Sequence, residues 1–107
     1  QEIYSCLKNN CEKLNVLEQV ELYRQSAENY VRRTKDIEFD LIFLDPPYEK
    51  DYINKLLPQI IEKFAKNGTY IFIETNSYEE EVYHEFMELL KEASSGDSTG
   101  RLYQINK

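Results

Sequence analysis

Two dense apolar runs predict two buried strands. Asp40 to Leu44 ends in four consecutive apolar residues, and Tyr70 to Ile73 forms a second run of β-forming residues. Runs of this kind are typical of strands covered on both faces, as in parallel sheets. The pair Asn67-Gly68 precedes the second run and predicts the turn that leads into it.

A helix is predicted between the two strands. Asp51 is a good N-cap residue, and the helix that it starts reaches about Phe64. Pro58 falls inside this helix, where a proline costs about 3 kcal/mol or more. We therefore expect a kink or a restart of the helix near Leu57.

Two further helices and a short strand are predicted before Asp40. Val20 to Tyr23 alternates apolar and polar residues, which favours a short strand. Ser26 is an N-cap residue for a helix that runs to about Arg33. The first helix spans Glu2 to Leu14, because apolar residues recur along one of its faces: Ile3, Leu7, Cys11 and Leu14. Helices and strands that alternate in this way predict an α/β fold with a largely parallel sheet.

Length and composition limit the alternatives. A chain of 107 residues has room for one modest domain, and its apolar content of 41% is ordinary for a soluble protein. No apolar stretch approaches the roughly 20 residues that span a bilayer. Cys6 and Cys11 are poorly placed to pair with each other on one helix, so we expect reduced thiols, no metal site and a cytoplasmic location.

The net charge of −7 is unusual for a protein that binds nucleic acid, since phosphate contacts need basic residues. A local basic patch could provide the phosphate contacts despite the negative net charge. The same basic residues could instead form a solvated helix face. The candidates are Arg24, Arg32, Arg33 and Lys35.

The strongest chemical signal is the sequence Asp45-Pro46-Pro47-Tyr48, directly after the first apolar strand. Proline has a fixed φ and also restrains the residue before it, so this corner is held extended beyond the carboxyl end of the strand. In open α/β sheets, ligands bind at that edge. A carboxylate, a rigid exposed carbonyl and an aromatic ring suit a flat, hydrogen-bonding ligand such as a nucleobase. A turn with only a structural role is the alternative.

This motif resembles motif IV of S-adenosylmethionine-dependent methyltransferases that modify exocyclic amino groups of bases. The segment FDLIFLDPPYEK from Phe39 to Lys50, followed by a helix and by Gly68 to Glu74, is similar to the bacterial RsmD-type family. Enzymes of that family methylate the N2 amino group of a guanine in 16S ribosomal RNA. The resemblance covers essentially the whole chain, but only the later part of the family's domain.

The resemblance implies a role for each residue of the motif. The Asp45 carboxylate and the Pro46 carbonyl would accept the two amine hydrogens, Pro47 would stiffen the turn, and Tyr48 would stack on an unstacked base. These four are the candidate catalytic residues. The candidate cofactor-binding residues are Ser26, Ala27, Leu44 and Asp45. Ser26 stands where the family often has an Asp or Asn that binds the adenine amino group, and its N-cap role explains it equally well.

The last third of the chain is ambiguous. By propensity, Glu79 to Ala93 could form one amphipathic helix. The resemblance instead implies a strand near Met87 to Lys91, a turn in the Ser- and Gly-rich segment 94–100, and a final strand at Arg101 to Ile105. It also implies that Arg101 touches RNA phosphate. We expect the hairpin, and with it a carboxyl-terminal antiparallel edge on the sheet.

The chain contains no glycine-rich loop after an early strand, since its three glycines are Gly68, Gly96 and Gly100. In the family, that loop and the acid ending the next strand hold the cofactor. We therefore expect residues 1–107 to be the carboxyl-terminal part of one methyltransferase domain, a partial Rossmann-like class I sheet without its first two strands. The missing strands would leave unpaired edges and uncovered apolar faces, so we expect the chain to be marginally stable by itself.

The resemblance therefore predicts S-adenosylmethionine-dependent methyl transfer to a guanine amino group in 16S ribosomal RNA, with ribosomal RNA or the small ribosomal subunit as partner. Two alternatives remain. A DNA methyltransferase acting on the amino group of adenine or cytosine uses the same acceptor geometry. A non-catalytic interaction module would keep the fold without binding a cofactor, as the absent glycine loop favours.

Overall fold

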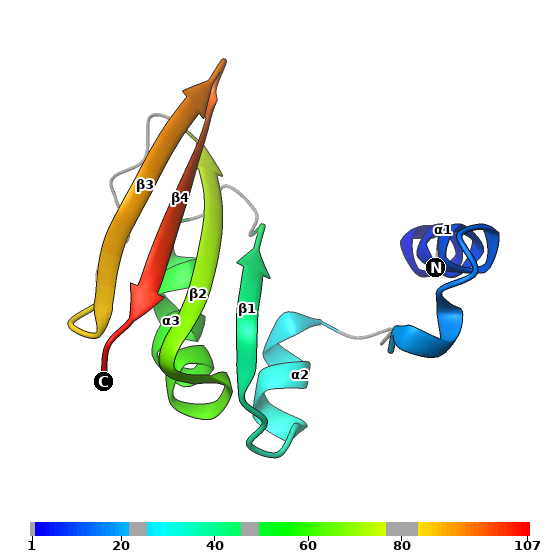
Figure 1. Cartoon of the computed structure of the whole chain (residues 1–107), viewed down its shortest axis with the longest axis horizontal. Coiled ribbons are helices and arrows are strands. Elements are labelled where there is room, and N and C mark those ends of the chain that lie inside the picture. The colour runs from blue at the N-terminus through cyan, green and yellow to red at the C-terminus, as the bar shows by residue number, and fades with distance from the viewer. Residues whose placement is uncertain (1, 22–25, 46–49, 77–83) are drawn as a thin grey trace. The chain divides into compact units, whose positions relative to one another are not determined.

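The computed structural model describes residues 2–21, 26–45, 50–76 and 84–107. The chain divides into two compact units, Gln1–Arg32 and Arg33–Lys107, which are described separately. The elements, in chain order, are α1 (Glu2–Lys13), the 3₁₀ helix η1 (Leu17–Gln19), α2 (Ala27–Arg33), β1 (Phe39–Leu44), α3 (Lys50–Phe64), β2 (Ala65–Asn76), β3 (Met87–Ser95) and β4 (Ser98–Ile105) (Figure 1).

The first unit contains the two helices predicted there. α1 ends one residue earlier than predicted, and Asn15 has a φ of 61°, the left-handed conformation that commonly terminates a helix. Ser26 caps α2 as predicted, because its Oγ accepts a hydrogen bond from the Asn29 N–H at 3.1 Å. Of the predicted strand Val20 to Tyr23, the first two residues are not in a strand, and the others lie outside the described residues.

The second unit is built on a four-stranded sheet with the order β1-β2-β4-β3. β1 and β2 are parallel, whereas β2–β4 and β3–β4 are antiparallel. The α/β class is confirmed, but the expected largely parallel sheet is corrected to a mixed one among the described strands. The two-residue connection accounts for the antiparallel β3–β4 pair, because so short a turn can join only antiparallel neighbours. β4 is antiparallel to β2 as well, so only one of the three described pairings is parallel.

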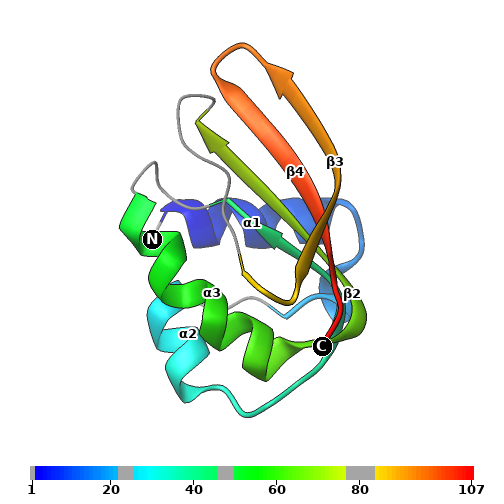
Figure 2. The ribbon, with the colours of Figure 1, turned by 90° about the vertical axis from the view of Figure 1, so that its left-hand side faces the viewer.

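α3 covers one face of this sheet (Figure 2). Alternate residues of β2 and β4 point toward the helix, as the period of two in a strand requires. Ile71 and Ile105 are fully buried there, and Tyr103 is 2% exposed. The core also includes three residues of α3 and two more of β2: Ile53, Leu57, Ile61, Ala65 and Ile73.

α3 corrects two details of the prediction. It begins at Lys50, so Asp51 lies in its first turn and not at the N-cap; an acid is favourable in either position because of the helix dipole. The helix also continues through Pro58, so the expected restart near Leu57 is wrong. Packing of the apolar face on the sheet offsets the proline's cost, because Leu57 and Ile61 on either side of Pro58 are buried in the core.

The β3–β4 hairpin confirms the strand interpretation and excludes one continuous helix from Glu79 to Ala93. Both strands are longer than predicted, and the turn is confined to Gly96 and Asp97, with Gly96 at a φ of 60°. The extension comes from polar pairing across the strands, where the Ser94 and Thr99 hydroxyls lie 2.8 Å apart.

A buried threonine joins the start of β2 to β1. The Thr69 hydroxyl donates to the Phe39 carbonyl at 2.7 Å and accepts from the Lys66 N–H at 2.9 Å. These bonds bridge the irregularity in register, where Phe39 pairs with Ala65 but Leu41 pairs with Tyr70. Thr69 is fully buried, so neither bond can be replaced by water without rearrangement.

Replacing Thr69 with valine is expected to destabilise the fold by about 1–3 kcal/mol, because the Phe39 carbonyl and the Lys66 N–H lose the hydroxyl of a fully buried side chain as their partner. Thr69→Ser keeps the hydroxyl and is the matched control. Chemical denaturation of both variants measures their free energies of unfolding. Equal free energies of unfolding for the two would show that the hydroxyl does not hold this junction.

An exposed ion pair lies on the same two strands. Lys66 Nζ is 2.9 Å from Asp40 Oδ1, and the hydrogen bond to this ammonium, followed by its charge, lowers the pKa of the Asp40 carboxyl. The same contacts raise the pKa of Lys66. Because the carboxyl's pKa is lowered in the folded state, its contribution to stability is present above the ordinary carboxyl pKa and is lost as the pH falls through the lowered value.

We expect Lys66→Gln to raise the pKa of Asp40 toward its ordinary value, which an NMR titration of the carboxyl carbon would measure. High salt should have the same effect on the unchanged protein, since exposed pairs are screened. An Asp40 pKa that responds to neither change would contradict the ion pair.

Candidate active site at the carboxyl end of β1

Asp45 lies directly after β1, at the carboxyl end of the parallel β1–β2 pair. Its side chain is exposed, in keeping with a residue that meets a ligand. The pairing of Leu44 with Ile73 brings Glu74 next to Asp45 on the neighbouring strand. Glu74 is half-buried. The register therefore places two acidic residues, each one position after a paired residue, near the edge where open α/β sheets bind ligands.

The structure describes the other candidate residues to different extents. Pro46, Pro47 and Tyr48 lie outside the described residues, so their catalytic roles stay predictions. Leu44 is half-buried and packs against the core, which explains it without a ligand.

Ser26 and Ala27, the other two candidate cofactor-binding residues, lie in the first unit. Both are exposed, at the start of α2. The bond from Asn29 gives Ser26 a structural role as N-cap. Of the candidate basic patch, Arg24 lies outside the described residues, and Arg32 Nη2 donates to Asn29 Oδ1 at 2.5 Å.

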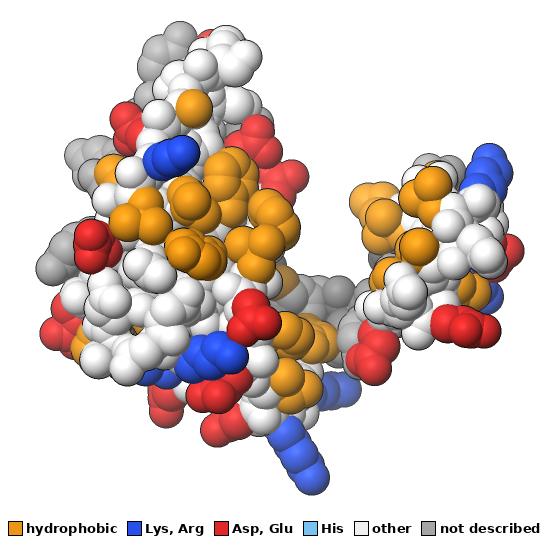
Figure 3. Space-filling model, in the orientation of Figure 1, with side chains coloured by type: hydrophobic (Ala, Val, Ile, Leu, Met, Phe, Trp, Pro, Cys, Tyr) orange, Lys and Arg blue, Asp and Glu red, His pale blue; other side chains and the backbone are white. Residues whose placement is uncertain are grey.

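The face of the sheet opposite α3 is apolar and open within the second unit. Leu41 is 48% exposed, Phe43 70% and Tyr70 41%, and Figure 3 shows apolar side chains gathered over these strands. Among the described strands, β1 is also an edge of the sheet. The uncovered face and unpaired edge expected from the sequence are therefore present here.

An aromatic pair on this face lies next to the two acids. The rings of Phe43 and Phe72 meet edge to face with centroids 5.8 Å apart. Phe72 also lies over Gly100, where an added Cβ would come within 2.5 Å of Cζ of the ring. Gly100 is the cross-strand partner of Glu74, so β4 presents no side chain opposite that carboxylate.

Arg101 does not fit the expected contact with RNA phosphate. It is only 9% exposed and points to the α3 side of the sheet. Its Nε donates to Glu92 Oε2 at 2.6 Å, and its Nη1 donates to Thr75 Oγ1 at 3.3 Å. The guanidinium is therefore engaged inside the fold, where a glutamate already balances its charge.

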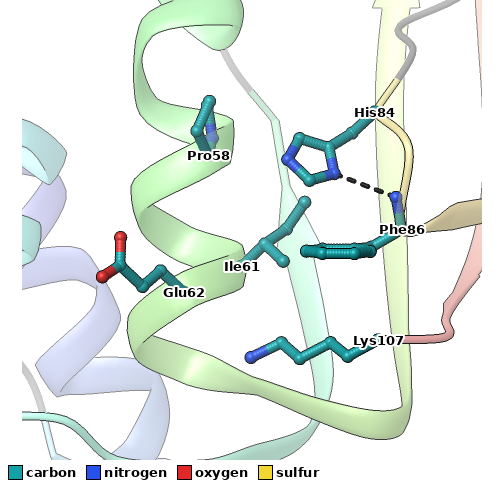
Figure 4. A pocket seen from close by; sticks show the side chains of 6 residues that line it. All are labelled: Pro58, Ile61, Glu62, His84, Phe86 and Lys107. Atoms are coloured by element: carbon teal, nitrogen blue, oxygen red, sulfur yellow. Dashed lines mark hydrogen bonds between the residues drawn. The ribbon is translucent and has the colours of Figure 1, made fainter.

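A separate pocket of about 360 Å³ lies at the other end of the sheet (Figure 4). Its lining comes from three segments: Pro58, Ile61, Glu62, His84, Phe86 and Lys107. His84 Nδ1 accepts from the Phe86 N–H at 3.1 Å, and Lys107 Nζ donates to the Ala65 carbonyl at 2.5 Å. Sequence reasoning missed this pocket because no local pattern connects segments so distant in the chain. Its distance from Asp45 along the strands separates it from the candidate active site.

No helix in the described parts of the chain is both long and apolar enough to cross a membrane.

Curated relatives carry methyltransferase names. One named ribosomal RNA small subunit methyltransferase D, from Haemophilus influenzae, is 31% identical over 101 residues, which cover 92% of this chain and 52% of the relative. Another of that name, from Buchnera aphidicola, is 30% identical over 76 residues, covering 69% of this chain and 39% of the relative. The chain thus spans about half or less of the length of these relatives.

Solved structures match across almost the whole chain. A Haemophilus influenzae protein assigned as a methylase superposes with a TM-score of 0.85 at 28% identity, covering 100% of this chain and 68% of the other. A conserved hypothetical protein from Streptococcus pyogenes gives a TM-score of 0.88 at 21% identity, with coverages of 99% and 67%, and so shows the fold alone.

The family model described as conserved hypothetical protein 95 matches residues 1–104. Together with the two curated relatives, this match confirms the resemblance to RsmD-type methyltransferases that the sequence suggested. The chain belongs to this family.

Proposed function

We propose that the protein containing this chain transfers a methyl group from S-adenosylmethionine to the exocyclic N2 amino group of a guanine in 16S ribosomal RNA. Its partner would be the small ribosomal subunit or its RNA, in the cytoplasm. The observation that carries the proposal is Asp45, an exposed carboxylate directly after a strand at the carboxyl end of a parallel pair, in a chain of the RsmD-type family.

The chemistry requires positioning more than acid or base strength. The lone pair of a base's amino group is delocalised into the ring, so it must be localised and aimed at the methyl carbon. The Asp45 carboxylate would accept one amine hydrogen, and the Pro46 carbonyl would accept the other. Holding the reacting atoms in line in this way can supply a large share of the rate acceleration.

The cofactor would lie beside Leu44 and Asp45, at the carboxyl end of β1. When bound, it would supply a methyl group on a sulfonium: the amine nitrogen would gain a bond to carbon, the carbon–sulfur bond would break with its electron pair left on sulfur, and one amine proton would be released. The described residues offer only part of such a pocket, since Gly68 and Gly96 lie in a strand and a hairpin turn. The protein's contacts to the methionine and ribose moieties would therefore lie outside this chain.

The decisive experiment uses protein expressed from the complete gene. It should methylate small ribosomal subunits from a strain that lacks this modification, with N2-methylguanosine identified by mass spectrometry of digested RNA. Double-stranded DNA of matched length is the control substrate. Methylation of adenine or cytosine in DNA, with none in RNA, would instead establish the DNA methyltransferase.

The incomplete pocket favours one second candidate, a non-catalytic module with this fold. Calorimetric titration of the 107-residue chain with S-adenosylhomocysteine tests whether its cofactor pocket is incomplete. We expect no measurable binding by this chain and clear binding by the complete gene product. Failure of both to bind would favour the non-catalytic module.

A further inference from the structure

Glu74 is a second carboxylate at the candidate active site. It follows Ile73, the residue of β2 that pairs with Leu44 of β1. Because side chains alternate along a strand and Ile73 faces the core, Glu74 projects from the opposite, open face. Asp45 follows Leu44, the last residue of β1 and the partner of Ile73, so each of the two acids comes one position after a paired residue that faces the core.

The surroundings leave the Glu74 carboxylate available. Within the part of the chain that the structure describes, it makes no hydrogen bond or ion pair, although it is half-buried. On its other side, β4 places Gly100 opposite it, so no β4 side chain pairs with this carboxylate, and the ring of Phe72 lies over the glycine. Arg101, the nearest cation along β4, projects from the opposite face and is engaged with Glu92.

Two acceptors on neighbouring strands match the Watson–Crick edge of guanine. That edge carries two donors side by side, the N1–H and the N2 amino group, and adjacent strands are about 4.8 Å apart. Carboxylates that converge from two strands can therefore accept from the two donors at once. Adenine has an acceptor at N1, which would face a second acceptor and be repelled.

We propose that Glu74 determines specificity by accepting a hydrogen bond from the N1–H of the target guanine while Asp45 accepts from the N2 amine. The inference rests on the proposed function and adds to it the choice of base. Glu74 would recognise N1, while Asp45 would position the N2 amino group for methyl transfer.

The test uses a substrate base that differs from guanine in the protonation of N1. 2-Aminopurine keeps the 2-amino group but has an unprotonated N1 that accepts a hydrogen bond. Protein from the complete gene should methylate RNA containing guanine about 10- to 100-fold faster than RNA containing 2-aminopurine at the target position, the range expected for one hydrogen bond to a charged group.

Glu74→Gln should reduce this ratio toward one, because the amide NH₂ can donate to N1 of 2-aminopurine. Glu62→Gln is the matched control, since Glu62 is exposed on α3 at the opposite face of the sheet, and it should leave the ratio unchanged. If Glu74→Gln fails to fold by circular dichroism, Glu74→Ala should also lower the ratio, by removing the carboxylate.

The results separate the two proposals. Methylation of neither RNA by the unchanged protein would overturn the proposed function and the role of Glu74 together. Methylation of guanine and 2-aminopurine at equal rates would overturn the role of Glu74 alone. A ratio in the Glu74 variant equal to that of the Glu62 variant would overturn it as well, with methyl transfer intact.

Discussion

Replacing Asp45 with alanine is expected to lower the turnover of the complete gene product at least about 100-fold, with little change in cofactor affinity. The reason is positional: without the carboxylate, the amino group of the base is no longer held in line with the methyl group, and small displacements of reacting atoms cost about this much. Single-turnover methylation of RNA measures the rate, and calorimetry with S-adenosylhomocysteine measures the affinity.

Asp36→Ala is the matched control, because it makes the same chemical change at an exposed position in the segment before β1. It should leave the rate within the error of the assay. Unchanged turnover in the Asp45 variant would remove this residue from the mechanism. Parallel loss in both variants would indicate a general effect of lost negative charge.

Replacing Ile71 with alanine is expected to destabilise the protein by about 2–5 kcal/mol. Ile71 is fully buried between α3 and the centre of the sheet, where β2 pairs with both β1 and β4. Loss of three carbons there removes the burial energy of those atoms and leaves a cavity that the packed neighbours fill only in part. Urea denaturation of the complete gene product, followed by circular dichroism, provides the free energy of unfolding.

The control removes the same atoms from an exposed isoleucine. Ile37 is 46% exposed in the segment before β1, and Ile37→Ala should change the free energy of unfolding by no more than about 0.5 kcal/mol. If the two variants were equally stable, Ile71 would not belong to the core of the protein.

Local sequence patterns predicted most of the helices and strands. The four apolar residues of β1 and the run from Tyr70 to Ile73 predicted strands correctly, because they are short, rich in β-forming residues and bounded by turn residues. The expectation that both faces of these strands are buried was wrong within the second unit, where Leu41 and Phe43 are exposed. The N-cap at Ser26 was also predicted from the sequence, because the hydrogen bond joins its hydroxyl to a backbone N–H only three residues later. The continuity of α3 through Pro58 could not be predicted, since it depends on how strongly the helix packs against the sheet.

Prediction of the carboxyl-terminal hairpin required the family resemblance as well as the local sequence pattern. Propensity favoured a helix over Glu79 to Ala93, and tertiary pairing overrode it. The polar stretch from Ser94 to Gly100 was interpreted as a loop because serine and glycine are common in loops. In the structure, its hydroxyls pair across two strands, which only the partner strand's position reveals.

The candidate site was predicted in part. The place of Asp45 after β1 followed directly from the sequence, because an apolar run that ends in an acid and two prolines marks the end of a strand. Which residue of β2 lies beside the end of β1 depends on the register between the two strands, which no local pattern gives. The burial of Arg101 was equally beyond the sequence, since its partners Glu92 and Thr75 come from two other strands.

The strand order has a consequence for how the protein assembles on the ribosome. β4 comes last in the chain but lies between β2 and β3 in the sheet. During synthesis, β1, α3 and β2 emerge before β3 and β4, and one edge of β2 lacks its β4 neighbour until β4 has left the exit tunnel. The β3–β4 hairpin can form within microseconds once its turn is free, and it can then add to β2 as a preformed unit. Nascent chains that stall before β4 would therefore expose β2, and we expect chaperones to bind them at that strand.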